Sequence, residues 1–290
     1  MHAGDVLAEG ERHYNARLSV ANYRDIFARW ARDSAALRTA VPCQLDLPYG
    51  TQAMETLDLF LPAGRPRGTL MYIHGGYWRS LDKSDASIVA PPFTAAGYAV
   101  AVVNYALCPV VSVETIVDQV RRAAAWLHGH SADWGAPPER LFACGHSAGG
   151  HLAAMLLATD WPALQPGLPA RTIAGTVCVS ALYDLRPLLQ VPSVLEATRF
   201  TPESAAALSP ALHRPLTKAP LLTAVGLDEN PGFHEQFLAI SRSWHGVHAG
   251  HVACPGRDHF TILDELTHSD GAIALAALRL MRSQHATLLQ

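Results

Sequence analysis

The sequence contains no continuous apolar stretch that approaches the roughly 20 residues needed to cross a membrane. Residues Met1–Asp5 also lack the basic segment and the apolar core that are typical of a signal peptide. Charged residues are scarce, at 16%, and the net charge is only −3 at pH 7. Without a basic surplus, binding to nucleic acid or to an anionic membrane is not indicated. We expect a cytoplasmic protein with a small-molecule partner, and the composition leaves a homodimer open.

The sequence also lacks any CxxC pair, and its cysteines are odd in number, which excludes a regular disulfide framework. We expect reduced thiols at Cys43, Cys108, Cys144, Cys178 and Cys254.

Histidine, by contrast, is abundant, with 15 residues, and His245, His248 and His251 recur every three positions. That spacing puts His248 and His251 on opposite faces of a predicted strand, and no acidic residue accompanies them. We therefore expect no metal site and no cofactor.

Apolar segments of strand length alternate with segments of helix length along most of the chain. Strands are predicted near residues 69–73, 99–103, 140–144, 173–179, 220–225 and 248–254, and helices near 83–96, 113–128, 148–159, 232–243 and 270–283. A further helix is predicted outside the sheet over 21–38, and Gln44–Pro48 with Glu55–Leu61 predicts an antiparallel hairpin at the sheet edge. The alternation indicates an α/β fold with a mostly parallel central sheet and helices on both faces. One domain accounts for residues 1–290.

Residues 145–149 read GHSAG between a predicted strand and a predicted helix. This is the GxSxG pattern in which the serine occupies a sharp strand-to-helix turn that exposes its hydroxyl. The flanking glycines are needed because side chains there would collide with the neighbouring strand and helix. Ser147 is therefore the predicted nucleophile.

A second motif, HGGYW at His74–Trp78, directly follows an early predicted strand. Acyl transfer develops negative charge on the carbonyl oxygen, and backbone amides aimed at that oxygen stabilise it by about 3 kcal/mol each. We assign an oxyanion hole to the amides of Gly76, Tyr77 and Ala148, the last being the residue after the nucleophile.

The nucleophile also needs a base and an acid, in the chain order Ser, Asp, His. His259 lies on a predicted loop after the last strand and is the predicted base. Asp228 follows the strand that immediately precedes the strand of the histidine, and we take it as the acid. Asp184 and Glu229 remain alternatives. In these roles Ser147 attacks a carbonyl carbon, His259 transfers the proton, and a covalent acyl-enzyme forms.

Residues 185–219 interrupt the alternation with five prolines and short helix-like pieces. An insertion at this point would overhang the carboxyl edge of the sheet, so we predict a cap over the site, with Leu188, Leu195 and Phe200 as its apolar lining. Three aromatic residues, Tyr77, Trp78 and Tyr183, together with Phe200, are the candidate walls of a substrate pocket.

Taken together, HGGxW, GHSAGG, the segment Gly226–Glu229 with Phe233 and Gln236, and Gly256–Phe260 resemble the kynurenine formamidase (arylformamidase) branch of the α/β-hydrolases. The resemblance spans most of the chain. It implies the α/β-hydrolase fold, the triad Ser147, Asp228 and His259, and an oxyanion hole at Gly76 and Tyr77. It also implies hydrolysis of an aryl formamide such as N-formylkynurenine to formate and the free arylamine, in tryptophan degradation.

Two other functions remain open from the sequence. The same motifs occur in short-acyl carboxylesterases of unrelated pathways, because the fold says little about the acyl or leaving group. A hydrolase-fold binding protein without catalysis is the third hypothesis, and it would be expected to have a damaged triad.

Overall fold

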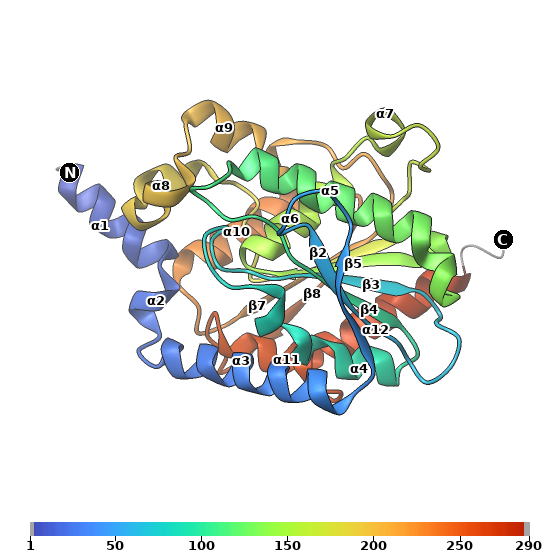
Figure 1. Ribbon diagram of the computed structural model, residues 1–290. Helices are drawn as coiled ribbons and strands as arrows, with labels where there is room; N and C mark the ends of the chain where they lie inside the picture. The colour runs from blue at the N-terminus through green and yellow to red at the C-terminus, as the bar shows by residue number, and fades with distance from the viewer. Residues whose placement is uncertain (1–2, 287–290) are drawn as a thin grey trace.

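An eight-stranded sheet forms the centre of the computed structural model, which describes residues 3–286 (Figure 1). The strand order is β1-β2-β4-β3-β5-β6-β7-β8. Strands β1 and β2, and β2 and β4, pair antiparallel, whereas all other neighbours pair parallel. The strands are β1 Cys43–Pro48, β2 Thr56–Phe60, β3 Thr69–Ile73, β4 Ala99–Val103, β5 Leu141–His146, β6 Gly175–Val179, β7 Leu221–Gly226 and β8 His248–Cys254. The predicted edge hairpin and parallel sheet are confirmed.

Helices cover both faces of this sheet, as the alternation predicts. On one face lie α5 (Val113–His130), α6 (Ala148–Leu157) and α10 (Pro231–Ser243). On the other lie α3 (Tyr23–Ala40), α4 (Ala90–Ala95), α11 (Asp264–Thr267) and α12 (Ala272–Ala286) (Figure 1). The remaining helices are α1 Ala3–Tyr14, α2 Ala16–Ser19, α7 Trp161–Leu164, α8 Pro192–Thr198 and α9 Pro202–Ala207. The architecture is that of the α/β-hydrolases.

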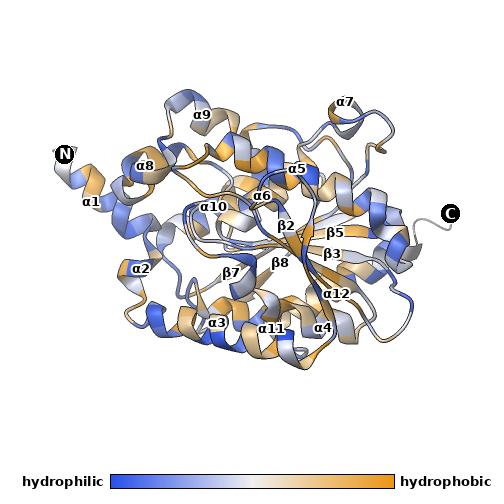
Figure 2. Cartoon of the chain, in the orientation of Figure 1, coloured by the Kyte–Doolittle hydropathy of each residue, from blue (hydrophilic) through white to orange (hydrophobic). Residues whose placement is uncertain are grey.

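The inner strands are apolar along their whole length because they are covered on both faces. Every residue of β3, β4, β5, β6 and β7 is buried. Helices such as α5 instead carry an apolar stripe toward the sheet and a polar face toward solvent (Figure 2).

All five cysteines are free thiols. No helix within residues 3–286 is long and apolar enough to cross a membrane.

Short 3₁₀ turns connect several of these elements. They cover Lys83–Asp85, Ser87–Val89, Ser131–Trp134, Pro138–Arg140, Arg186–Gln190, Pro210–Leu212 and Thr261–Leu263. The segment predicted as a helix over 83–96 is thus two such turns followed by α4.

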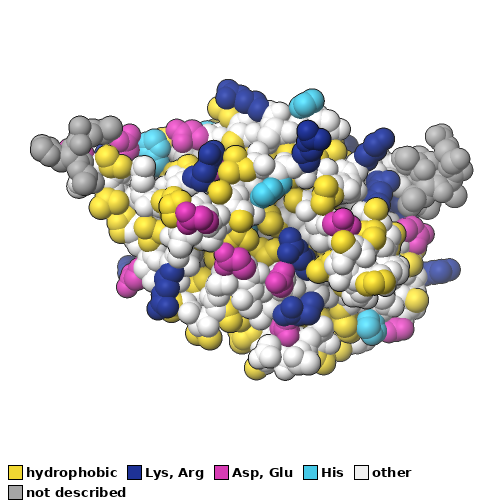
Figure 3. Space-filling view, turned by 90° about the horizontal axis from the view of Figure 1, so that it is seen from above, with side chains coloured by type: hydrophobic (Ala, Val, Ile, Leu, Met, Phe, Trp, Pro, Cys, Tyr) yellow, Lys and Arg dark blue, Asp and Glu magenta, His cyan; other side chains and the backbone are white. Residues whose placement is uncertain are grey.

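On the face that carries α5, α7 and α9, acidic and basic side chains are interspersed without a patch of one sign (Figure 3).

The edge strand β8 shows that the expected placement of His248 and His251 is wrong. His248 and His251 do not lie on opposite faces, because the register slips between the pairs Leu221↔His248 and Leu222↔Gly250. The extra residue brings both imidazoles to the hydroxyl of Thr223, at 2.9 Å from His248 Nε2 and 3.1 Å from His251 Nδ1. Even so, no group of three or more metal-ligating side chains is found in the described part of the chain.

Candidate active site

Ser147 occupies the turn between β5 and α6, as GxSxG predicts. Its backbone has a positive φ of 56° with ψ −121°, a combination that residues with a side chain rarely adopt. A Cβ at Gly145 would collide with the carbonyl oxygen of Gly149, and one at Gly149 would collide with that of Ile73. The glycines therefore allow β5, α6 and β3 to approach closely enough to hold the serine in this strained conformation.

A continuous chain of hydrogen bonds leads away from the serine hydroxyl. Ser147 Oγ lies 3.0 Å from His259 Nε2, and His259 Nδ1 lies 2.8 Å from Glu229 Oε2. The imidazole and the carboxylate are both buried, and the Phe233 ring stacks on the imidazole with centroids 4.0 Å apart. Such a chain can pass the hydroxyl proton to Nε2 while the carboxylate fixes the tautomer through Nδ1.

The expectation that Asp228 supplies the carboxylate is wrong, and Glu229, one of the alternatives, takes that place. The chain turns sharply after β7, with the Glu229 amide donating to the carbonyl of Gly226 and the Asp228 amide to that of Arg257. This turn leaves Asp228 exposed and directs the next side chain back under His259. Asp184 lies elsewhere and pairs with Arg186.

Glu229 is held by more than its histidine. Its second oxygen, Oε1, accepts hydrogen bonds from Ser180 Oγ at 2.6 Å and from the Gly226 amide at 2.7 Å. Two donors on one oxygen hold the carboxylate in place and orient the other oxygen toward Nδ1. Sequence reasoning missed Ser180, although its position at the end of β6 places it at the carboxyl edge of the sheet.

His146 supports the imidazole from the other side without competing with it. Its Nε2 donates to the backbone carbonyl of His259 at 2.7 Å. Burial, and to a smaller extent the neighbouring His259, lowers the pKa of His146 well below its ordinary value. It therefore stays neutral at pH 7 and adds no positive charge beside His259.

The HGGYW segment presents backbone amides beside the serine. The amides of Gly76, Tyr77 and Ala148 have no hydrogen-bond acceptor among residues 3–286. Gly76, Tyr77 and Trp78 all have positive φ, at 99°, 51° and 56°. Gly76 adopts this conformation freely, but Tyr77 and Trp78 are strained there, so surrounding contacts have to hold the loop.

Those contacts come from buried side chains behind the loop. The Trp78 ring is fully buried and packs edge-on against His151 and Phe200, with centroids 5.1 and 5.6 Å apart. Ser80 Oγ donates to the carbonyl of Gly76 at 3.0 Å. The Tyr77 hydroxyl donates to the carbonyl of Tyr14, at the end of α1. The strained loop is thereby fixed before any ligand binds.

A narrow pocket of about 30 Å³ opens beside Ser147 and His259. Its aromatic lining consists of Phe27, Trp30, Tyr77 and Phe260. Phe27 stacks on Trp30 with centroids 5.1 Å apart and meets Phe260 edge-on at the same distance. The helix α3, expected only to pack outside the sheet, thus supplies part of the wall, and its aromatic spacing at 27 and 30 was the available signal.

Of the predicted pocket residues, Tyr77 lines the pocket, whereas the prediction is wrong for the other three. Trp78, Tyr183 and Phe200 are buried and do not line the pocket. Trp78 and Phe200 pack against each other behind the loop, and the Tyr183 amide donates to Gln236 Oε1. Aromatic side chains close to the motifs in sequence therefore support the backbone of the site.

The insertion over 185–219 contributes Ser193 to the lining rather than Leu188, Leu195 or Phe200. The N-terminal segment contributes Asn15, Ala16 and Arg17 to the lining, and it lies beside α8 at the same end of the molecule (Figure 1). Glu11 ties the two together, because it accepts from the Ser193 amide at 2.7 Å, from Ser193 Oγ at 2.9 Å and from Asn15 Nδ2 at 2.7 Å. The sequence carried no local signal for this arrangement.

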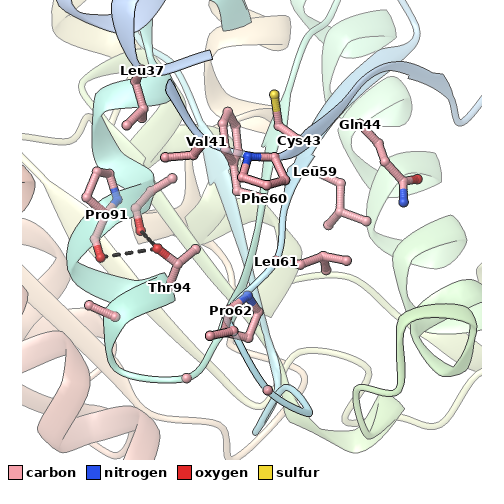
Figure 4. Close-up of a pocket in the computed structure, with 16 residues that line it drawn as sticks. Leu37, Val41, Cys43, Gln44, Leu59, Phe60, Leu61, Pro62, Pro91 and Thr94 are labelled. Atoms are coloured by element: carbon pink, nitrogen blue, oxygen red, sulfur yellow. Dashed lines mark hydrogen bonds between the residues drawn. The ribbon is translucent and has the colours of Figure 1, made fainter. Parts of the chain in front are cut away.

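A larger apolar groove, of about 800 Å³, lies between α3, β2 and α4 (Figure 4). Its lining includes Leu37, Phe60 and Pro91 but neither Ser147 nor His259. It therefore does not belong to the candidate active site.

The chain is similar in sequence and structure to several known proteins. A family model described as BD-FAE matches residues 57–182. Kynurenine formamidase from Salmo salar is 32% identical over 82% of this chain and 81% of that protein, and the one from Danio rerio is 30% identical over 84% of each. A crystal structure from Silicibacter sp. TM1040, provisionally named a thioesterase, superposes with a TM-score of 0.82 at 31% identity, covering 91% of this chain and 96% of that one.

Proposed function

Because the chain belongs to the kynurenine formamidase family of α/β-hydrolases, we propose that it is a serine hydrolase that cleaves aryl formamides such as N-formylkynurenine. The observation that carries this proposal is the hydrogen-bonded chain from Ser147 through His259 to Glu229, beside three amides without an acceptor among the described residues. Formate and the free arylamine are the products, which would give the enzyme a role in tryptophan degradation.

In the first half-reaction, Ser147 Oγ attacks the formyl carbon while His259 Nε2 takes the hydroxyl proton. Glu229 accepts the hydrogen bond from Nδ1 and stabilises the imidazolium. The negative charge that develops on the carbonyl oxygen is stabilised by the amides of Gly76, Tyr77 and Ala148, each contributing about 3 kcal/mol. His259 then returns the proton to the leaving nitrogen as the C–N bond breaks.

The second half-reaction releases the formyl group from Ser147. Water donates a proton to His259 Nε2 as its oxygen attacks the ester carbon, and the same amides stabilise the second oxyanion. The proton returns to Ser147 Oγ as the C–O bond breaks, and formic acid leaves and ionises to formate in solution. The histidine thus ends in its starting protonation state, and no cofactor is needed.

The aromatic lining of the pocket supports an aryl leaving group. Phe27, Trp30, Tyr77 and Phe260 offer ring faces and edges against which an aromatic ring packs favourably, by about 0.5–1.5 kcal/mol per pair beyond area burial.

A paired assay tests the substrate class. Purified protein is given N-formylkynurenine and p-nitrophenyl acetate, and kcat/KM is measured for each. We expect a much higher value for the formamide. The reverse preference would favour a short-acyl carboxylesterase, the second candidate, which is supported by the BD-FAE match over residues 57–182 and by the provisionally named thioesterase.

Covalent labelling tests the serine chemistry itself. We expect a fluorophosphonate to modify Ser147, and digestion with mass spectrometry identifies the labelled peptide. A protein that is not labelled and hydrolyses neither substrate would instead be a hydrolase-fold binding protein.

A further inference from the structure

Two arginine side chains line the pocket beside Ser147, from different parts of the chain. Arg17 belongs to the short helix α2, and Arg79 follows the HGGYW segment. Among the described residues, no aspartate or glutamate lines this pocket. The pocket therefore carries positive charge at pH 7, although the protein as a whole has a net charge of −3.

Arg17 is held in place but has no counter-charge. Its Nη2 donates to Ser80 Oγ at 2.8 Å, and its guanidinium carbon lies 5.7 Å from the ring centroids of both Tyr23 and Phe27. Burial, followed by the nearby charge of Arg79, lowers the pKa of Arg17. These contacts fix the guanidinium at the pocket while leaving most of its N–H donors available.

The lack of a carboxylate distinguishes this pair from other cations of the protein. Neither Arg17 nor Arg79 forms an ion pair with any residue between positions 3 and 286, whereas Arg29, Arg122 and Arg257 each do. A partly buried charge without an opposite charge is unfavourable in the empty protein. An anionic ligand would remove that cost on binding.

Glu11 is the acidic group nearest to this region along α1, and it is already engaged. Its carboxylate accepts hydrogen bonds from the Ser193 amide, Ser193 Oγ and Asn15 Nδ2. Burial raises the pKa of Glu11, but these hydrogen bonds, and to a smaller extent the charge of Arg79, outweigh it and leave the pKa below its ordinary value. Glu11 thus joins α1 to α8 and does not neutralise the pocket.

Building on the proposed function, we propose that Arg17, assisted by Arg79, binds a carboxylate carried by the leaving group of the substrate. The aryl ring then lies against the wall that contains Phe27, and the scissile bond lies at Ser147. A guanidinium suits this task because its planar fork can donate two parallel hydrogen bonds to one carboxylate. The substrate class is accordingly an aryl amide or ester with an anionic side chain, which includes N-formylkynurenine through its amino-acid carboxylate.

Two substrates that differ only in charge test this inference. One is an aryl formamide whose ortho side chain ends in a carboxylate, and the other is the same compound with a primary carboxamide there. We expect kcat/KM of the wild-type protein to be at least 10-fold higher for the carboxylate. Arg17→Gln should lower kcat/KM for the carboxylate about 10- to 100-fold, mainly by raising KM, since charged hydrogen bonds have this strength.

The neutral carboxamide serves as the internal control. Arg17→Gln should change its kcat/KM less than about threefold, because both compounds use the same loop and the same serine. Arg79→Gln should show the same selectivity change to a smaller extent. Arg17→Lys should restore part of the preference, because it retains the charge and loses the fork.

Arg24→Gln is the matched control variant. The guanidinium carbon of Arg24 lies 5.0 Å from the Tyr23 ring centroid, but Arg24 is exposed and does not line the pocket. Its replacement removes one positive charge from the same region and should leave the ratio of the two kcat/KM values unchanged.

Several results would overturn the inference and leave the proposed function intact. One is wild-type protein that hydrolyses both compounds equally well. Another is an equal loss for both compounds in Arg17→Gln, which would show that Arg17 only supports the loop through Ser80. Hydrolysis of neither compound by wild-type protein would instead overturn the proposed function.

Discussion

Replacing Glu229 with glutamine is expected to lower kcat about 1,000- to 10,000-fold, which corresponds to roughly 4–5.5 kcal/mol of transition-state stabilisation. The reason lies in the donors around the side chain. Oε1 accepts from Ser180 Oγ and from the Gly226 amide, and Oε2 faces His259 Nδ1. An amide NH₂ on either side of the glutamine therefore meets a group that must donate.

Both orientations of the glutamine are unfavourable for catalysis. With its oxygen toward Gly226, the NH₂ faces Nδ1 and forces the histidine to carry its proton on Nε2, so that the ring cannot accept the proton of Ser147. With its oxygen toward Nδ1, the NH₂ faces the Gly226 amide, so that two donors meet. In the native protein that amide donates to Glu229 Oε1 at 2.7 Å. In either orientation the negative charge that stabilises the imidazolium is lost.

The assay measures kcat on N-formylkynurenine and on p-nitrophenyl acetate, and circular dichroism verifies the fold of each variant. Asp228→Asn is the matched control, because Asp228 is adjacent in sequence and exposed, and we expect less than about a twofold change. Asp184→Asn should also be mild, since Asp184 pairs with Arg186 away from the imidazole. Glu229→Gln with more than a tenth of wild-type activity, together with a severe loss in Asp228→Asn, would refute the assignment.

Three further predictions concern the turn and its support. Ser147→Ala should lower kcat by several orders of magnitude with the fold retained, because the triad acts as a unit; near-normal turnover would refute the nucleophile. Gly149→Ala should lower the free energy of unfolding by more than about 2 kcal/mol in urea titrations, because its Cβ would collide with the carbonyl of Ile73; an unchanged midpoint would contradict this. Burial lowers the pKa of His151 to about 4, so the unfolded chain binds its proton first and stability falls as the pH drops below about 6.5. The loss should be about 2 kcal/mol between pH 7 and pH 5, and His151→Gln should reduce this slope; an equal slope in the variant would assign it to other groups.

The strands and the flanking helices could be predicted because their signals are local. Completely buried strands such as Leu141–His146 read as apolar runs, and the helix over 113–128 shows an amphipathic repeat. The spacing rule failed at His248 and His251, because a one-residue bulge against β7 reverses the face of every following residue. A bulge depends on the partner strand, and the local sequence does not specify it.

The site likewise combines features that the local sequence determines with features that depend on distant contacts. The sequence by itself determined the position of Ser147 and the glycine-rich loop, since both depend on steric limits within a few residues of the chain. Only the tertiary structure decided between Asp228 and Glu229, because a turn against Arg257 sets which side chain points inward. It also decided that α2 and α3 supply part of the pocket wall and the inserted segment contributes Ser193, because the amphipathic repeat of α3 predicts a buried face but not which distant part of the chain that face contacts.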